Sequence, residues 1–317
     1  MESTQNLKRR MRSVQNIGQI TKAMELVAAT KMRRSQELAL GSRPYAYATL
    51  EILGIIAGLK DVPMPALLRG RTAEERTGRT AFMIVTSDKG LAGSFNGAVF
   101  RKFEQYAREN RLDIRPPQAV FFAVGQKAKS YLEHRGLAVA RSFTRVGDFT
   151  RMDEVNPISD ALIDGYLHGD FDEVVSFSTH FITALRQDVF VRQLLPVSAE
   201  KVRESIELLV PTAGRFSEYI DLESFDEDGR AEYRIEPSPA AVLAPLARDL
   251  LRIRVYHNIL EANASEHSAR RVAMKNASDN ASELSGNLNI EYNKSRQTAI
   301  TNQIIEVTSG AQTASSN

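Results

Sequence analysis

The sequence predicts an α/β protein in which one domain of strands and helices is inserted between two long terminal helices. Residues 239–308 contain no proline after Pro245 and a single glycine, Gly286, and their apolar residues recur at helical spacing. Residues 3–59 carry a second helical stripe, and short apolar runs alternate with helical patterns between the two. The two ends of the chain are therefore expected to pair with each other.

The C-terminal helix is expected to run from about Pro239 to Thr308. Its apolar stripe consists of Leu243, Leu246, Leu250, Ile253, Leu260, Ala264, Ala273, Ala277, Ala281, Leu284, Leu288, Ile300 and Ile304. A helix of roughly 70 residues is about 105 Å long, so it must bury this stripe against another long helix or other chains. Between Asn263 and Ala281 the stripe is small and polar, which predicts a spindle held by its surroundings. The tail after Gly310 is expected to fray.

The first 59 residues predict the partner helix. Its stripe consists of Leu7, Met11, Val14, Ile17, Ile20, Met24, Val27, Ala28 and Met32. Ser3 or Thr4 is expected to cap it, whereas Gly41 and Pro44 are expected to kink or interrupt it. Residues 1–43 carry nine lysines or arginines against three glutamates, so this end is basic although the net charge of the chain is only +2.

The middle of the chain predicts an α/β domain that follows a loop over residues 61–79. Strands are expected at Ala81–Thr86, Ala119–Val124, Leu137–Phe143, Glu173–Thr179 and Val189–Val197, with a short one at Tyr233–Ile235. Helices are expected at 96–110, Gln126–Arg135 and Ile158–Leu167. The strands Glu173–Thr179 and Val189–Val197 are expected to be antiparallel neighbours. The predicted domains are residues 1–60 (N-terminal coiled-coil helix), 61–238 (inserted α/β domain) and 239–317 (C-terminal coiled-coil helix).

Composition narrows the class of protein. The absence of cysteine excludes disulfides, a thiolate nucleophile and a Cys-ligated metal, and it suits a reducing compartment. The N-terminus is polar and basic, unlike a secretory signal. The most apolar run, Leu50 to Leu59, is shorter than a transmembrane helix and contains glycine. Contact with a membrane is therefore expected only through a partner.

A glycine-bearing turn follows the first predicted strand and opens a helix, which is where phosphate-binding loops occur. Its glycines, Gly90, Gly93 and Gly97, match neither the P-loop nor the dinucleotide-binding pattern. A nucleotide site remains one alternative, and a helix-capping turn is the structural one. The favoured functional interpretation is protein docking through exposed Asp88 and Lys89.

Three other kinds of site are disfavoured: a metal or catalytic-histidine site, a nucleophilic serine and a nucleic-acid site. The five histidines are scattered without ligand spacing, and no nucleophile-elbow motif is present. The basic N-terminal stretch lacks interleaved aromatic residues and lies beside an apolar stripe, so binding to acidic loops of a protein or simple solvation is favoured over nucleic acid. A coiled-coil scaffold or nucleic-acid-binding protein stays the alternative to a structural subunit.

Two blocks of sequence resemble a known family. Gln19–Gln36 is similar to the opening signature ITKAM-x-x-VAA-x-K of the γ subunits of F-type ATP synthases. The family's closing signature is resembled by Ala264–Glu266, Val272–Asn280 and Tyr292–Thr301, and further similarity lies at Thr86–Gly93, Leu194–Pro196 and Glu236–Pro237. The resemblance covers nearly the whole chain. The cysteine-bearing insertion of chloroplast forms is missing, so control by thiols is not expected. Because no targeting peptide is recognised, the bacterial type is favoured, and a mature organellar chain is the alternative.

The resemblance implies a non-catalytic rotor of the central stalk. Its fold would be a long antiparallel coiled coil of the terminal helices, with an inserted Rossmann-like α/β domain. It would couple proton-driven rotation of the membrane c-ring to ATP synthesis or hydrolysis on the α3β3 hexamer, with the ε subunit as a further partner. The family implies no cofactor, metal or nucleic-acid partner for this chain, and a peripheral location on the cytoplasmic face of the inner membrane.

The resemblance also implies three groups of contact residues. Lys22, Met24, Lys31 and Arg33 match family positions that face the acidic lever loop of a β subunit. Arg296, Gln297 and Thr301 match positions that meet the catch loops of β. Tyr233 and Glu236 match the Y-x-x-E-P stretch that faces the c-ring and the ε subunit. Changes of charge in the first two groups are expected to alter coupling.

Overall fold

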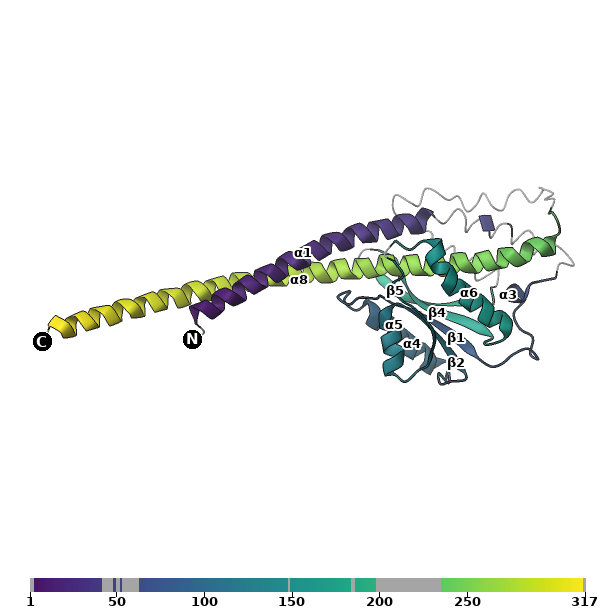
Figure 1. The fold of residues 1–317 in the computed structure, drawn as a ribbon, viewed down its shortest axis with the longest axis horizontal. Helices are drawn as coiled ribbons and strands as arrows, with labels where there is room; N and C mark the ends of the chain where they lie inside the picture. The colour runs from purple at the N-terminus through teal and green to yellow at the C-terminus, as the bar shows by residue number, and fades with distance from the viewer. Residues whose placement is uncertain are drawn as a thin grey trace. The chain divides into compact units, whose positions relative to one another are not determined.

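The computed structural model describes residues 3–41, 48–49, 52, 63–147, 149–183, 186–197 and 235–315. The chain divides into two compact units, Met1–Ala29 with Arg270–Asn317 (unit 1) and Thr30–Ala269 (unit 2). Two helices contribute to both: α1 (Thr4–Gly41) and α8 (Pro239–Ser315), drawn in purple and in green to yellow in Figure 1. The 77 residues of α8 confirm the long C-terminal helix.

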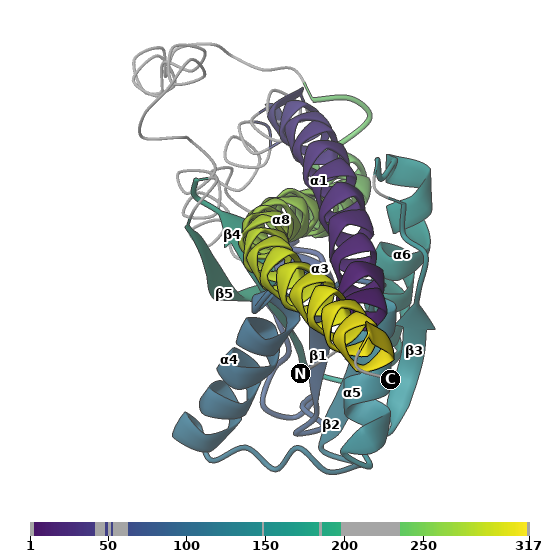
Figure 2. The ribbon, with the colours of Figure 1, turned by 90° about the vertical axis from the view of Figure 1, so that its left-hand side faces the viewer.

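Unit 1 is a pair of antiparallel helices, the first part of α1 and the last part of α8 (Figure 2). The helices approach closely where small residues meet: a Cβ added to Gly18 would lie 3.4 Å from the Cβ of Ala281. The hydroxyl of Ser278 donates to the Gly18 carbonyl at 3.5 Å. Leu7 and Leu288 are buried farther along the unit. The predicted pairing of the two ends of the chain is confirmed.

Unit 2 is built on a five-stranded sheet in the order β3-β2-β1-β4-β5. The strands are β1 (Thr80–Val85), β2 (Ala119–Val124), β3 (Val139–Phe143), β4 (Glu173–Phe181) and β5 (Gln187–Leu195). The first four are parallel, and β5 runs antiparallel to β4, as predicted. The helices between them are α3 (Ala66–Arg69), α4 (Phe95–Glu109), α5 (Gln126–His134) and α6 (Met152–His168).

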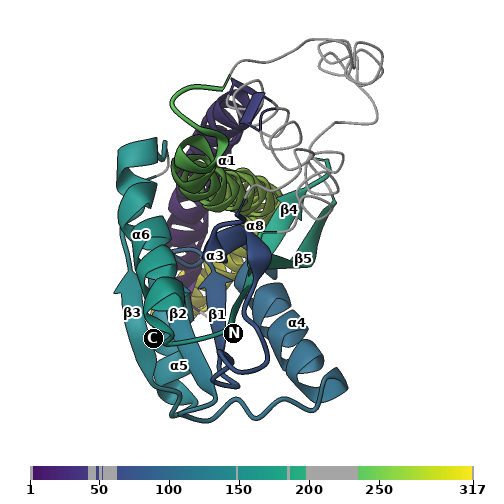
Figure 3. The ribbon, with the colours of Figure 1, turned by 90° about the vertical axis from the view of Figure 1, so that its right-hand side faces the viewer.

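The sheet is covered on both faces, which explains why its central strands are uninterrupted apolar runs. Along β1, Phe82 and Ile84 point into a core shared with α4 and α5. Met83 and Val85 point into the opposite core, where α6 and α8 lie (Figure 3). Since successive side chains of a strand face opposite sides, β1 contributes to both cores.

Several boundaries differ from the prediction. Helix α6 begins six residues before the predicted Ile158, because the Glu154 carboxylate accepts a hydrogen bond from the Arg151 amide at 2.9 Å and caps the helix there. Helix α3 lies within the predicted loop, Ile235 is not in a strand, and α8 is helical to Ser315 instead of fraying after Gly310. The expected break at Pro44 falls outside the described residues.

Candidate partner-binding surfaces

In unit 1, Lys22 and Met24 lie on α1. Met24 is half-buried, whereas Lys22 is exposed and its ammonium is paired with Glu25 at 2.8 Å. The exposed side of α1 also carries apolar residues, among them Ile17, Ile20, Leu26 and Val27. This mixture of cation and apolar surface suits a protein partner better than water alone.

Lys31 and Arg33 belong to the part of α1 that lies in unit 2. Lys31 is half-buried and Arg33 is exposed. The guanidinium of Arg33 is therefore accessible to an acidic group of another chain, which is what the predicted contact requires.

The last part of α8 presents Arg296, Gln297 and Thr301 to solvent. The Thr301 hydroxyl donates to the carbonyl of Gln297 at 2.9 Å, so it is held against its own helix. Large apolar residues are exposed on the same stretch: Ile290, Ile300, Ile304, Ile305 and Val307, with Ile304 at 60% and Val307 at 73%. A helix end with this much exposed apolar surface indicates a site that other chains cover.

The turn between β1 and α4 is fixed by its own side chains. The amide of Ser87 donates to the Asn96 side-chain oxygen at 3.0 Å, and the Asn96 amide group donates to the Ser87 hydroxyl at 2.8 Å. These bonds favour the structural interpretation of a tight turn over a phosphate cradle.

Asp88 and Lys89 differ in environment. The Asp88 carboxylate accepts hydrogen bonds from the Gln126 amide, which opens α5, and from the Arg145 amide, both at 2.8 Å. Asp88 is half-buried, so the prediction that it is exposed is wrong; Lys89 is exposed as predicted. Because both Asp88 oxygens are occupied, we interpret Asp88 as a residue that joins two loops. A docking role for the pair stays a prediction.

Of the third predicted group of contact residues, Tyr233 and Glu236, the structure describes only Glu236. Glu236 is exposed and lies just before α8. Tyr233 falls outside the described residues, so the proposed pair cannot be compared with the structure at that position.

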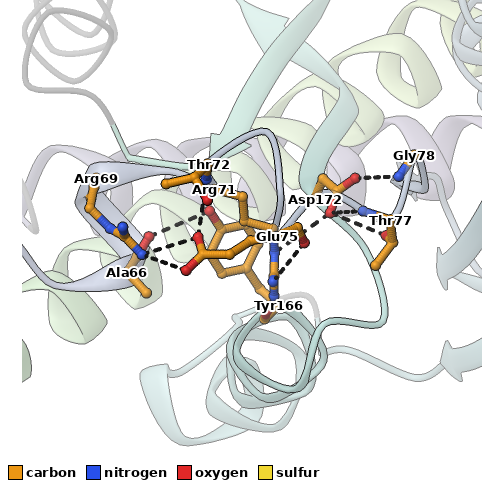
Figure 4. Close-up of polar contacts among 9 residues, drawn as sticks. All are labelled: Ala66, Arg69, Arg71, Thr72, Glu75, Thr77, Gly78, Tyr166 and Asp172. Atoms are coloured by element: carbon orange, nitrogen blue, oxygen red, sulfur yellow. Dashed lines mark hydrogen bonds and ion pairs between the residues drawn. The ribbon is translucent and has the colours of Figure 1, made fainter.

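At the end of the sheet where the strands β1 and β4 begin, a polar cluster holds the loop that precedes β1 (Figure 4). The Asp172 carboxylate accepts hydrogen bonds from the amides of Thr77 at 2.9 Å and Gly78 at 2.6 Å. Arg71 lies beside it, with its Nε 3.6 Å from Asp172, and also donates to the carbonyl of Tyr166 at the end of α6. Asp172 thus ties the loop to the start of β4.

The same loop is also closed upon itself. Glu75 accepts hydrogen bonds from the Thr72 amide at 3.0 Å and from Arg69 at 3.1 Å. These bonds lower the pKa of Glu75 below its usual value, the Thr72 amide having the largest effect. The carboxylate therefore stays ionised and keeps the loop closed at neutral pH.

A network of largely buried charges lies between α8 and the strands β4 and β5. Glu261 of α8 is buried, and its Oε2 lies 3.0 Å from Nη1 of Arg192 on β5 and 2.9 Å from Nδ1 of His180 on β4. Arg192 also donates to the Asn258 side-chain oxygen at 2.8 Å, and the Asn258 amide group donates to the Ser176 hydroxyl at 2.8 Å. The network joins one helix to two strands.

The electrostatics of this network favour ionised groups. Burial raises the pKa of Glu261, but the charge of Arg192 and the hydrogen bond to His180 outweigh it and lower the pKa to about 2. Next to it, burial lowers the pKa of Arg254 to about 10, and Arg254 donates to the carbonyls of Gln193 at 2.8 Å and Leu194 at 3.2 Å. Glu261 and Arg254 are thus both charged at neutral pH.

Sequence reasoning missed this network. In the sequence, Glu261 and Asn258 stand in the apolar part of the long helix, and His180 is one of five scattered histidines. The available signal was the spacing of Arg254, Asn258 and Glu261, which places three polar residues on one face of a helix that is apolar around them.

Comparison with known proteins identifies the family. A family model described as ATP synthase matches residues 3–313. The ATP synthase gamma chain of Moorella thermoacetica is 34% identical over 311 residues, which cover 98% of this chain and 99% of the relative. The chain belongs to the ATP synthase gamma-chain family. The gamma chain of Roseiflexus castenholzii is similarly related, at 35% identity over 98% of each chain.

Solved structures confirm the fold of this gamma-family chain. A chain in the rotor-containing structure of the Euglena gracilis mitochondrial ATP synthase (OSCP/F1/c-ring, rotational state 3) aligns with a TM-score of 0.60 at 17% identity, covering 98% of this chain and 94% of that one. A chain of the Tetrahymena thermophila central stalk/c-ring structure gives 0.54 at 23% identity, covering 82% and 99%. The predicted α/β class with long terminal helices is therefore confirmed.

Two features are absent from the part of the chain that the structure describes. None of its helices combines the length and hydropathy of a membrane span. In the same residues, His, Asp and Glu side chains do not gather in threes as a metal site requires.

Proposed function

We propose that this chain is the central-stalk rotor subunit of an F1Fo ATP synthase. It couples proton-driven rotation of a c-ring to ATP synthesis or hydrolysis on an α3β3 hexamer. The family assignment supports the class of machine, and the exposed apolar end of α8 carries the proposal for this chain. Residues such as Ile304 and Val307 need a covering surface, which a ring of surrounding subunits provides.

In this proposal the chain has no catalytic site of its own, and the chemistry takes place on the β subunits. Arg296, Gln297 and Thr301 contact the catch loops of β, while Lys22, Met24, Lys31 and Arg33 contact its acidic lever loop. Tyr233 and Glu236 contact the ε subunit and the c-ring. The chain is peripheral, on the cytoplasmic face of the inner membrane, and reaches the membrane through these partners.

The proposed mechanism is mechanical. A two-helix shaft is not threefold symmetric, so each catalytic subunit meets a different face of it at any moment. A contact shifts a nucleotide state only if it differs in free energy between the states. Rotation therefore presents each β subunit in turn with the face that stabilises its next state.

Co-purification tests the proposal. The untagged chain is isolated from detergent-solubilised membranes through an affinity tag on a β subunit. Recovery of this chain with α, β and c subunits in constant ratio supports the rotor. Equilibrium dialysis with ATP and salt-dependent binding to duplex DNA test the enzyme and nucleic-acid alternatives. Tight stoichiometric binding in either assay, with no co-purification, would contradict the rotor.

A further inference from the structure

We propose that Glu261 and Arg192 are the positioning residues that fix the rotational register of α8 over the sheet. In that role they carry the torsional load between the α/β domain and the helix. The inference rests on the proposed rotor function and assigns a part of it to residues away from every predicted contact with a partner.

The first reason is that the apolar packing of α8 is poorly suited to resist rotation. In this region large apolar residues point in every direction around α8, between its polar ones, with Leu250, Leu251, Ile259 and Leu260 buried in one core. Apolar burial is non-directional, so a helix turned by one residue, about 100°, still buries a similar area. Packing alone therefore holds α8 on the sheet without defining which face it presents.

The second reason is that the charged network has one geometry only. The carboxylate of Glu261 faces Arg192 and His180 from two different strands. Turning α8 by one residue removes that carboxylate from both and leaves Arg192 buried without it. An uncompensated buried charge is among the most unfavourable changes a fold can undergo, and fixing register is the best-attested use of a buried polar group.

The third reason is that α8 is also held from the other side. Arg252 pairs with Asp160 of α6 at 2.8 Å, and Tyr256 and Asn263 donate to Thr150 at 3.2 and 2.8 Å. At 3.6 residues per turn, positions 252, 256 and 263 lie on the helix face opposite positions 254, 258 and 261. Contacts on opposite faces resist a twist of the helix in either direction.

The test distinguishes a loss of the rotational register of α8 from a loss of stability. In the assembled complex, reconstituted in vesicles, Arg192→Met is combined with Glu261→Leu. Replacement of a buried ion pair by apolar side chains of similar volume is often neutral for stability, so the thermal midpoint is expected to change little. The ratio of ATP-driven proton pumping to ATP hydrolysis is expected to fall. If two registers become comparably populated, about half of the shafts are misplaced and the ratio falls about twofold.

A matched control lies on the same hairpin. Arg186 and Asp188 form an exposed pair at 3.0 Å, and Arg186→Met with Asp188→Leu is expected to leave the pumping ratio at the wild-type value. A wild-type ratio in the Arg192→Met/Glu261→Leu complex would overturn the inference. If that double variant does not assemble, Glu261→Gln takes its place, and a wild-type ratio there overturns it equally. If adding the wild-type chain to the complex produces no ATP-driven proton pumping, the proposed function is contradicted instead.

Discussion

The turn between β2 and α5 makes a demanding test of how this domain is built. Gly125 has a φ of +93°, and a Cβ added there would lie 2.1 Å from the carbonyl oxygen of Thr86 and 2.8 Å from its carbonyl carbon. With a ψ of 146° as well, Gly125 lies in a region of backbone conformation that is essentially restricted to glycine, where an L-residue costs about 1–3 kcal/mol. Overpacking against backbone that cannot turn away adds about 1–3 kcal/mol. Gly125→Ala is therefore expected to lower the free energy of unfolding by about 4 kcal/mol, the middle of the combined range.

A second glycine provides the matched control. Gly136 also has a positive φ, +69°, but an added Cβ meets nothing within 4 Å. Gly136→Ala should therefore show only the conformational cost, about 1–2 kcal/mol. Urea unfolding of both variants, followed by circular dichroism because the chain has no tryptophan, measures the two losses. Equal losses would refute the steric reasoning, because the close approach of Thr86 is what distinguishes the two sites.

Three further predictions follow from the same structure. Asp172→Ala removes the acceptor for the Thr77 and Gly78 amides and should lower the free energy of unfolding in urea by about 2–3 kcal/mol. The control Asp164→Ala, an exposed change on α6, should lower it little. Equal losses in the two variants would contradict the role of Asp172. The pKa of Glu261 is lowered to about 2 from 4.5, so its contribution, about 3 kcal/mol, is present above pH 4.5 and is lost as the pH falls towards 2. Glu261→Gln should flatten the stability profile in that window, and an unchanged profile would count against the network. Met24→Lys should impair coupling more than folding, because it places a cation beside the proposed acidic loop; a wild-type pumping ratio in this variant would refute that contact.

The sequence predicts a structural feature well when the residues that determine it are close to one another in the chain. Strand β2 was predicted with its correct ends because an apolar run is bounded by Pro117 and Gly125, and both bounds are visible in the sequence. The predicted start of α6, at Ile158 directly after Pro157, is wrong. In the structure Pro157 lies inside the helix, beyond a cap formed by Arg151 and Glu154.

In the candidate sites, too, features set by nearby residues were predictable and contacts between distant residues were not. The exposure of Arg296 and Gln297 was predictable, since a polar position near the end of a long helix faces outward. The pairing of Glu261 with Arg192 was not, because it joins residues 69 positions apart through a strand and a helix whose register the sequence does not state. The half-buried position of Asp88 likewise depends on the amide of Arg145, 57 residues away.

The proposed function requires that this chain turn inside a ring of catalytic subunits. Because the chain has no cysteine, Lys89→Cys introduces a single thiol at an exposed position of the α/β domain, and a bead attached there reports the motion of the chain while the catalytic ring is fixed to a surface. The bead is expected to rotate in one direction when ATP is added and to stop when ATP is removed. A bead that stays fixed while the immobilised complex hydrolyses ATP would contradict it.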